Sequence, residues 1–253
     1  MKHLAIGPGA LGYFALLGAL SRLWDEGSLK KLETLSGSSA GALLVCMVAI
    51  YDFDFQRILT ESIKVPIDRL RPQLKSLLTN YGLVPPETIR EVVLTCVPDM
   101  TFEEVYKKFP RKIYIAAHCV ELAQTHYFSV VTHPQMSIVD ALCMSISVPI
   151  IFSSFKHGPW TYFDGGVTET APCGHLLGED DVMILRIKYD DSFVISDVTS
   201  YMQLVFQTLL KMRKVYPYPT FVVNLGNTNL MDFKADEILK MKLYVKGYNF
   251  LDK

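Results

Sequence analysis

The sequence has no hydrophobic run long enough to cross a bilayer. A transmembrane helix needs about 20 consecutive apolar residues, and the longest uninterrupted candidate, residues 40–50, is much shorter. The first twenty residues are apolar, but Gly7, Pro8, Gly9 and Gly12 interrupt them and no clear small-residue cleavage site follows. This pattern argues against a secretory signal. We therefore expect a protein that is soluble or bound peripherally to a membrane.

The sequence also lacks an excess of charge of one sign. Its cysteines are not even in number, as a full set of disulfides would require. Lysine and arginine number 25 against 26 acidic residues, so the formal net charge is -1. Such a chain has no general field that would attract nucleic acid. The five cysteines are odd in number, far apart and mostly within apolar runs, as small core residues are. No spacing typical of metal ligands is present. We expect a reduced, cytoplasmic location, no nucleic-acid partner and no metal or organic cofactor.

What the sequence does contain is enough apolar side chain for one large core. Half of the 253 residues are hydrophobic and a fifth are charged, which fits a single domain over residues 1–253. Strand-like and helix-like segments alternate, which predicts an α/β fold with a mainly parallel central sheet flanked by helices on both faces. Strands are expected near residues 3–6, 34–36, 112–120, 125–131, 161–164, 181–187 and 220–225. Helices are expected at residues 13–24, 42–50, 137–147, 194–214 and 235–245, with amphipathic helical structure over residues 53–97.

Between the second strand and the apolar helix that follows it stands Gly37-Ser-Ser39-Ala-Gly41. This is the pattern G-x-S-x-G, in which small neighbours permit the strained strand-to-helix turn that exposes a nucleophilic serine. The pattern alone is moderate support, because small residues also form ordinary turns. Its place after a strand and before a buried helix favours Ser39 as a nucleophile, with Gly37 and Gly41 forming the elbow.

A glycine-rich turn, Gly7-Pro-Gly9-Ala10-Leu-Gly12, connects the first strand to the first helix. Free backbone N–H groups in such a turn can bind an anion. The pattern G-x-G-x-x-G also occurs in dinucleotide-binding proteins, which need an acidic residue at the end of the second strand. Here that position holds the serine elbow, and Glu33 lies on the entering side. An oxyanion hole with the amides of Gly9 and Ala10 as donors is therefore the preferred interpretation.

A third motif, Asp164-Gly165-Gly166, ends the strand at residues 161–164. An acidic residue before a turn is often only a turn-former. A carboxylate in a partly desolvated site can, however, act as the base for a serine nucleophile, because burial raises its pKa. The sequence makes Asp164 the candidate partner of Ser39.

The three motifs in this order resemble the patatin-like phospholipases. The resemblance extends over most of Lys2 to Pro172, including Ser147-Val-Pro149 and the spacing from Asp164 to Pro172. It implies a patatin-like fold and a lipid acyl hydrolase that cleaves phospholipid or other acyl-lipid esters. Two places differ from the family's usual pattern: the first loop carries Pro8 and Leu11 instead of a third glycine and a basic residue, and Thr170 stands where asparagine is common.

The resemblance also implies a catalytic pair of Ser39 and Asp164 without histidine. A Ser-Asp-His hydrolase would carry the same elbow, and His175 follows Asp164 in a suitable order. In that fold, however, several strands precede the elbow, whereas only two precede Ser39. The implied mechanism is attack by Ser39, proton transfer to Asp164 and formation of an acyl-enzyme that water hydrolyses.

Other interpretations remain at the level of sequence. A catalytically weak family member could bind lipid or protein, and a dinucleotide-binding protein is a further alternative. Two basic and apolar segments, residues 64–78 and 211–219, are candidates for contact with a membrane or lipid aggregate, although solvated helix faces often look the same.

Overall fold

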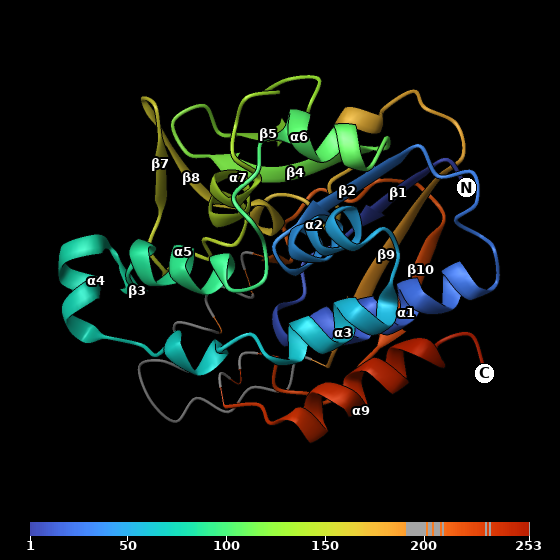
Figure 1. Cartoon of the computed structure of the whole chain (residues 1–253). Helices are drawn as coiled ribbons and strands as arrows, with labels where there is room; N and C mark the ends of the chain where they lie inside the picture. The colour runs from blue at the N-terminus through green and yellow to red at the C-terminus, as the bar shows by residue number, and fades with distance from the viewer. Residues whose placement is uncertain are drawn as a thin grey trace.

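The computed structural model describes residues 1–190, 201, 204, 208, 210–230, 232 and 234–252. In this part of the chain, an eight-stranded sheet has the order β10-β9-β1-β2-β4-β8-β7, with β5 beside β4 (Figure 1). The strands are β1 (His3–Ile6), β2 (Thr34–Ser38), β4 (Lys112–Cys119), β5 (Gln124–Phe128), β7 (Phe155–His157), β8 (Trp160–Asp164), β9 (Val182–Lys188) and β10 (Thr220–Asn224). A second sheet of two strands pairs β3 (Gly82–Val84) with β6 (Ile150–Phe152).

The centre of the large sheet is parallel. The pairs β10–β9, β9–β1, β1–β2 and β2–β4 all run in the same direction. At the other edge, β8, β7 and β5 add antiparallel strands. The predicted α/β class with a mainly parallel central sheet is confirmed. Strand β1 is buried along its whole length, as a strand covered on both faces must be.

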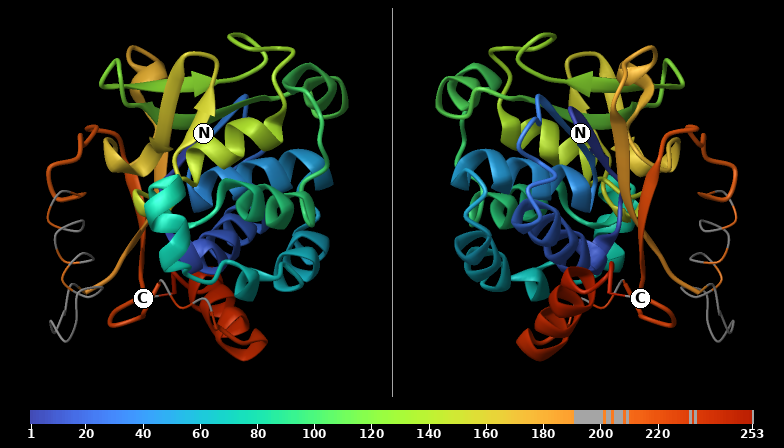
Figure 2. Two further views of the ribbon diagram at one scale, coloured as in Figure 1. Left: turned by 90° about the vertical axis from the view of Figure 1, so that its left-hand side faces the viewer. Right: turned by 90° about the vertical axis from the view of Figure 1, so that its right-hand side faces the viewer.

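One face of the sheet is covered by helices. Figure 1 shows α1, α2, α3 and α9 in front of the strands, and the side views of Figure 2 place them on the same side. The described α-helices of at least seven residues are α1 (Tyr13–Asp25), α2 (Ala40–Tyr51), α3 (Phe55–Ile63), α4 (Leu74–Asn80), α5 (Pro86–Leu94), α6 (Phe102–Lys108), α7 (Ile138–Ser145) and α9 (Glu237–Tyr248). The opposite face has a smaller core, made of Ala5, Ala171, Cys173, Leu176, Val182, Ile184 and Tyr216. The helix predicted at residues 194–214 falls largely outside the described residues.

Two glycines bring the first and last helices together. A Cβ atom on Gly18 would lie 2.0 Å from the carbonyl oxygen of Tyr244, and one on Gly247 would lie 2.0 Å from that of Ala15. Backbone therefore meets backbone where α1 and α9 cross, a contact that any side chain at these positions would prevent. The crossing ties the C-terminal helix to the first βα unit.

One local prediction was only partly right, because residues 53–97 contain the helices α3, α4 and α5 but also a strand. Residues 53–97 were expected to be helical, but they contain β3, whose Gly82 pairs with Ile150 and whose Val84 pairs with Phe152. A Cβ atom on Gly82 would lie 2.3 Å from the amide nitrogen of Ser153. The strand thus forms through pairing with a segment far away in the sequence, which helical periodicity does not reveal. Among the described residues, no helix has both the length and the apolarity that crossing a bilayer requires.

Candidate active site

Ser39 lies at a sharp turn between β2 and α2. Its backbone has φ 54° and ψ -124°, a conformation that costs a residue with a Cβ atom about 1–3 kcal/mol. The flanking glycines make the turn possible: a Cβ on Gly37 would lie 2.4 Å from the oxygen of Gly41, and one on Gly41 would lie 2.3 Å from that of Ile6. This is the geometry of a nucleophile elbow.

The elbow is held by a residue that the motifs did not reveal. The amide of Ser39 donates a hydrogen bond of 2.9 Å to Oγ of Ser145, which in turn donates to the carbonyl oxygen of Ala116 at 2.6 Å. Ser145 ends α7 and Ala116 lies in β4, so three separate elements hold the strained turn. Only its place near the end of a predicted apolar helix marked Ser145 in the sequence.

Asp164 is brought to this elbow by the pairing of strands. In the register of β4, Ser38 lies opposite Ala116 and Asp164 opposite Ala117. The two motifs therefore stand on either side of one strand, at nearly the same height. A Cβ on Gly165 would lie 3.1 Å from that of Ser38, so the turn after Asp164 rests against the elbow.

Asp164 is 3% exposed. Its Oδ1 accepts a hydrogen bond of 2.7 Å from the amide of Gly166, while Oδ2 makes no hydrogen bond within the described residues. Burial raises the pKa of Asp164 to about 6, against smaller lowering effects from the Ser39 hydroxyl, the Gly166 amide and the Arg213 guanidinium. The Ser39 hydroxyl is thus near enough to lower the pKa of the carboxylate. A carboxylate with a raised pKa and an unoccupied oxygen has the properties of a general base.

The glycine loop lies beside both residues. A Cβ on Gly166 would lie 2.6 Å from Cγ of Pro8, and one on Gly41 would lie 2.7 Å from the carbonyl oxygen of Gly7. Pro8, which departs from the usual family pattern, therefore packs on the turn that follows Asp164. The loop, the elbow and the Asp-Gly-Gly turn form one cluster.

Two amides of this loop are available to a ligand. The N–H groups of Gly7, Leu11 and Gly12 donate to the carbonyl oxygens of Leu185, Leu230 and Gly9, respectively. In the part of the chain that the structure describes, the amides of Gly9 and Ala10 have no such acceptor. Gly9 is partly exposed and Ala10 is exposed, with φ 44°. The loop can offer an anion these two donors, whereas Gly7 and Gly12 shape the backbone.

Glu33 does not meet the glycine loop. It precedes β2 and lies 3.9 Å from the ammonium group of Lys2, at the amino end of β1. The loop follows the carboxyl end of the same strand. The dinucleotide interpretation needs an acidic residue near the loop, and Glu33 is at the wrong end of the sheet for that role.

His175 lies apart from the proposed pair. Its Nε2 is 2.9 Å from Oγ of Ser36, and its ring packs against Tyr114 and Tyr127. Burial lowers the pKa of His175 to about 3, so the ring is neutral at physiological pH. Its contacts are those of a structural histidine, and they include neither Ser39 nor Asp164.

The loop after Asp164 is supported by a buried carboxylate that sequence reasoning did not single out. Glu169 is 6% exposed. It accepts hydrogen bonds from the hydroxyl of Tyr127, at 2.6 and 2.7 Å to its two oxygens, and from that of Tyr216 at 3.0 Å. Next to it, the amide of Thr170 donates to the carbonyl oxygen of Lys214 at 3.0 Å. These hydrogen bonds hold the loop in place although Thr170 replaces the usual asparagine.

Replacing Tyr127 by phenylalanine is expected to lower the free energy of unfolding by about 1.5–3 kcal/mol, because it removes the hydrogen bonds of the hydroxyl to the buried Glu169 and leaves the Gly174 amide without its acceptor. Tyr218→Phe serves as the control, since its hydroxyl donates a neutral hydrogen bond of 2.8 Å to the carbonyl oxygen of Leu176. That loss should be only about 1 kcal/mol. Urea denaturation measures both. Equal losses would contradict a supporting role of the Glu169 carboxylate.

Comparison with known sequences shows which proteins this chain is similar to. The family model described as patatin-like phospholipase matches residues 4–177, which is more than half of the chain. A "Probable lipid hydrolase 463L" of Invertebrate iridescent virus 6 is 26% identical over 182 residues, covering 68% of this chain and 61% of the relative. "Triacylglycerol lipase ptl3" of Schizosaccharomyces pombe is 25% identical over 148 residues, covering 54% of this chain and 30% of that protein. The chain thus spans less than two thirds of the length of these relatives.

A solved structure has the same fold. VipD from Legionella pneumophila matches with a TM-score of 0.61 and 15% identity, over 99% of this chain and 66% of that one. At this identity the match concerns the fold alone. The family model, however, includes the glycine loop, the elbow and the Asp-Gly-Gly turn within residues 4–177. The chain belongs to the patatin-like phospholipase family.

Proposed function

We propose that this chain hydrolyses acyl-lipid esters with Ser39 as nucleophile and Asp164 as base. The observation that carries the proposal is the buried Asp164 carboxylate, whose pKa is raised to about 6 and whose Oδ2 is free among the described residues, close to a serine at a strained elbow. A base with a pKa slightly below neutral is ionised at physiological pH and still accepts a proton readily.

In the proposed first step, Oγ of Ser39 attacks the ester carbonyl while its proton passes to Asp164. The carbonyl oxygen becomes negative and accepts hydrogen bonds from the amides of Gly9 and Ala10. When the carbon–oxygen bond breaks, the alcohol leaves with the proton from Asp164, and the acyl group remains on Ser39. The start of α2 places its helix dipole next to the reacting serine, which favours the developing negative charge.

The second step repeats the first with water as nucleophile. Asp164 takes a proton from water, the same two amides hold the oxyanion, and the fatty acid is released as Ser39 recovers its proton. We propose an acyl-lipid substrate because relatives are named as a probable lipid hydrolase and as triacylglycerol lipases. Such substrates are held in membranes or lipid droplets, so the enzyme has to work at an interface.

Covalent labelling tests the proposal. A fluorophosphonate probe should react with the folded wild-type protein, since Oγ of the nucleophile attacks phosphorus and fluoride leaves. Peptide mass spectrometry should place the adduct on Ser39 and not on Ser38, whose buried hydroxyl has no partner in the described residues. A folded protein that neither labels nor hydrolyses a short-chain ester would instead be a lipid- or protein-binding member of the family. Tight binding of NAD would favour the dinucleotide alternative.

A further inference from the structure

Three large apolar side chains of one short segment point into solvent. Leu74 and Leu78, one helical turn apart on α4, are 78% and 82% exposed, and Tyr81, which follows the helix, is 80% exposed. Ser76, on the other side of the helix, is buried and accepts a hydrogen bond of 3.3 Å from the side chain of Asn80. The helix thus buries a serine while it exposes two leucines, whereas an ordinary surface helix directs its apolar side chains toward the core.

The same segment is basic. Between Asp68 and Glu87 the sequence contains no acidic residue but includes Arg69, Arg71 and Lys75, and all three side chains are exposed. Arg71 lies 3.8 Å from Asp68. Among the described residues, Arg69 and Lys75 have no acidic partner. A segment that combines exposed leucines with exposed cations is complementary to an anionic lipid surface, where apolar groups enter the acyl region and cations meet the phosphates.

This segment lies on the side of the molecule that holds the active site. In Figure 1, β1 and β2 run from right to left, so the glycine loop and the elbow after them face the left side, where α4 also lies. The left panel of Figure 2, viewed from that side, shows α4 in the foreground. A lipid surface bound by α4 would therefore face the carboxyl ends of the parallel strands.

The segment is also attached to the frame of the site. The amide of Gln73, just before α4, donates to the carbonyl oxygen of Leu83 at 2.7 Å. Strand β3 then pairs with β6, which follows α7, the helix whose Ser145 holds the elbow. The segment is thus linked through β3, β6 and α7 to the residue that holds the elbow.

We propose that Leu74, Leu78 and Tyr81, together with Arg69 and Lys75, form a docking surface that binds anionic phospholipid membranes and presents the active site to them. We call these five residues the α4 tip. The proposal rests on the proposed function, because it assigns to that site the surface on which its substrate lies.

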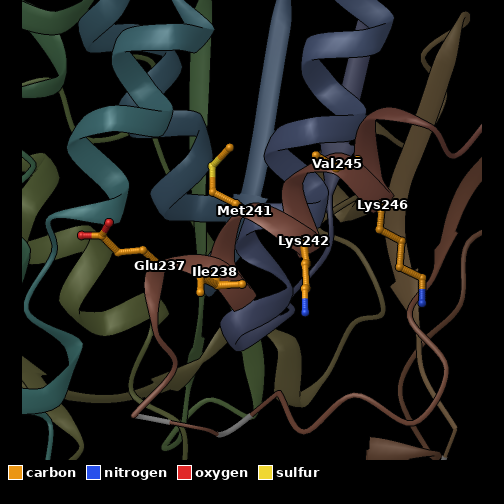
Figure 3. Close-up of a pocket in the computed structure, with 6 residues that line it drawn as sticks. All are labelled: Glu237, Ile238, Met241, Lys242, Val245 and Lys246. Atoms are coloured by element: carbon orange, nitrogen blue, oxygen red, sulfur yellow. The ribbon is translucent and has the colours of Figure 1, made fainter.

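A second exposed apolar stripe provides the matched control. On α9, Ile238, Met241 and Val245 are 64%, 40% and 50% exposed, and Figure 3 shows them beside Glu237 and the lysines of the same helix. Here an acidic residue begins the stripe, and the Lys246 ammonium group donates a hydrogen bond of 3.0 Å to the carbonyl oxygen of Leu225. Helix α9 lies at the bottom of Figure 1, away from α4.

Vesicle sedimentation tests the proposal with the full chain. The wild type should bind vesicles of phosphatidylcholine and phosphatidylserine more tightly than vesicles of phosphatidylcholine alone. Leu74→Ser/Leu78→Ser should weaken binding to both by about tenfold for each leucine that enters the acyl region. Arg69→Gln/Lys75→Gln should weaken binding to the anionic vesicles by about fivefold per cation, and salt should reduce that part of the binding. Ile238→Ser/Val245→Ser on α9 should bind as the wild type does.

Three results would overturn the proposal: wild-type protein that does not bind anionic vesicles, unchanged binding of the α4 leucine variant, or an equal loss in the α9 variant. Circular dichroism checks that each variant is folded, which we expect because the replaced side chains are exposed. Hydrolysis of a water-soluble short-chain ester separates this proposal from the proposed function. The α4 variants should retain that activity. A wild type that binds vesicles but hydrolyses no ester would contradict the proposed function and still support the docking surface.

Discussion

Ser39→Ala is expected to lower kcat/KM for a short-chain ester by about four orders of magnitude or more, as loss of the nucleophile does in other serine hydrolases. Alanine keeps the Cβ atom, so the strained backbone at φ 54° and its hydrogen bond from the Ser39 amide to Ser145 should persist. What is lost is the oxygen that would form the acyl-enzyme in the proposed mechanism. The measurement is the initial rate of ester hydrolysis, together with fluorophosphonate labelling, which should disappear.

The control for this variant is its neighbour. Ser38→Ala removes a buried hydroxyl that has no hydrogen-bond partner in the described residues, so activity should change by no more than a few-fold and stability should be unchanged or higher. The two variants replace adjacent serines of the same turn by the same residue. Comparable losses in both would show that the change acts through the elbow's packing, and would remove Ser39 from its role as nucleophile.

Asp164→Asn is expected to lower kcat/KM by about three orders of magnitude or more, because the amide cannot accept the serine proton. In the wild type, the same carboxylate should control the pH dependence. With a pKa of about 6, kcat/KM should rise with pH and reach a plateau above neutrality. About one pH unit below that pKa, it should be close to tenfold lower than at the plateau.

The same substitution should stabilise the fold at neutral pH. The pKa of Asp164 is raised from 3.8 to about 6 in the folded protein, so the folded state binds more protons than the unfolded state between these values. Its contribution to stability is therefore complete below about pH 4 and is lost as the pH rises through about 6. Asparagine removes the buried charge and should raise the free energy of unfolding above that range by about 2–3 kcal/mol.

Urea denaturation at several pH values, alongside the ester assay, measures both effects. Below about pH 4 the gain in stability over the wild type should disappear, because Asp164 is then neutral in both states. Full activity of the Asn variant would remove Asp164 from the mechanism. Loss of activity together with loss of stability would indicate that Asp164 is a structural carboxylate, and not a base kept in an unfavourable environment.

The site combines two features that oppose folding. Ser39 has a positive φ although it carries a Cβ atom, and Asp164 is a buried carboxyl with one unsatisfied oxygen in the described residues. Strain and burial of this kind persist only where the surrounding structure over-determines them. Here Ser145, Gly37, Gly41 and Gly166 supply the restraint, through hydrogen bonds or through contacts that admit no Cβ. The two residues whose conformation or burial is unfavourable, Ser39 and Asp164, are those to which we assign the chemistry.

Local sequence was sufficient for most of the large sheet. Strands β1, β4 and β9 are short apolar runs whose burial is visible in their composition, and α2 is apolar on every side because it lies in the core. The segment at residues 53–97 was misjudged because β3 depends on β6 for its hydrogen bonds, and the two are far apart along the chain. Strand pairing of this kind follows from tertiary packing, not from local propensity.

Sequence alone determined the parts of the site whose chemistry is local. The small residues around Ser39 are typical of a tight turn, and an acidic residue before two glycines is typical of the end of a strand. Both motifs were therefore recognisable without a structure. Tertiary structure decided what these parts do together. It placed Ser38 and Asp164 across one strand and buried the carboxylate, which raised its pKa. Within the described residues, it also left the Gly9 and Ala10 amides without backbone acceptors, while the amides of Gly7, Leu11 and Gly12 are hydrogen-bonded. Desolvation and the distance between distant residues depend on the whole fold, and no local pattern contains them.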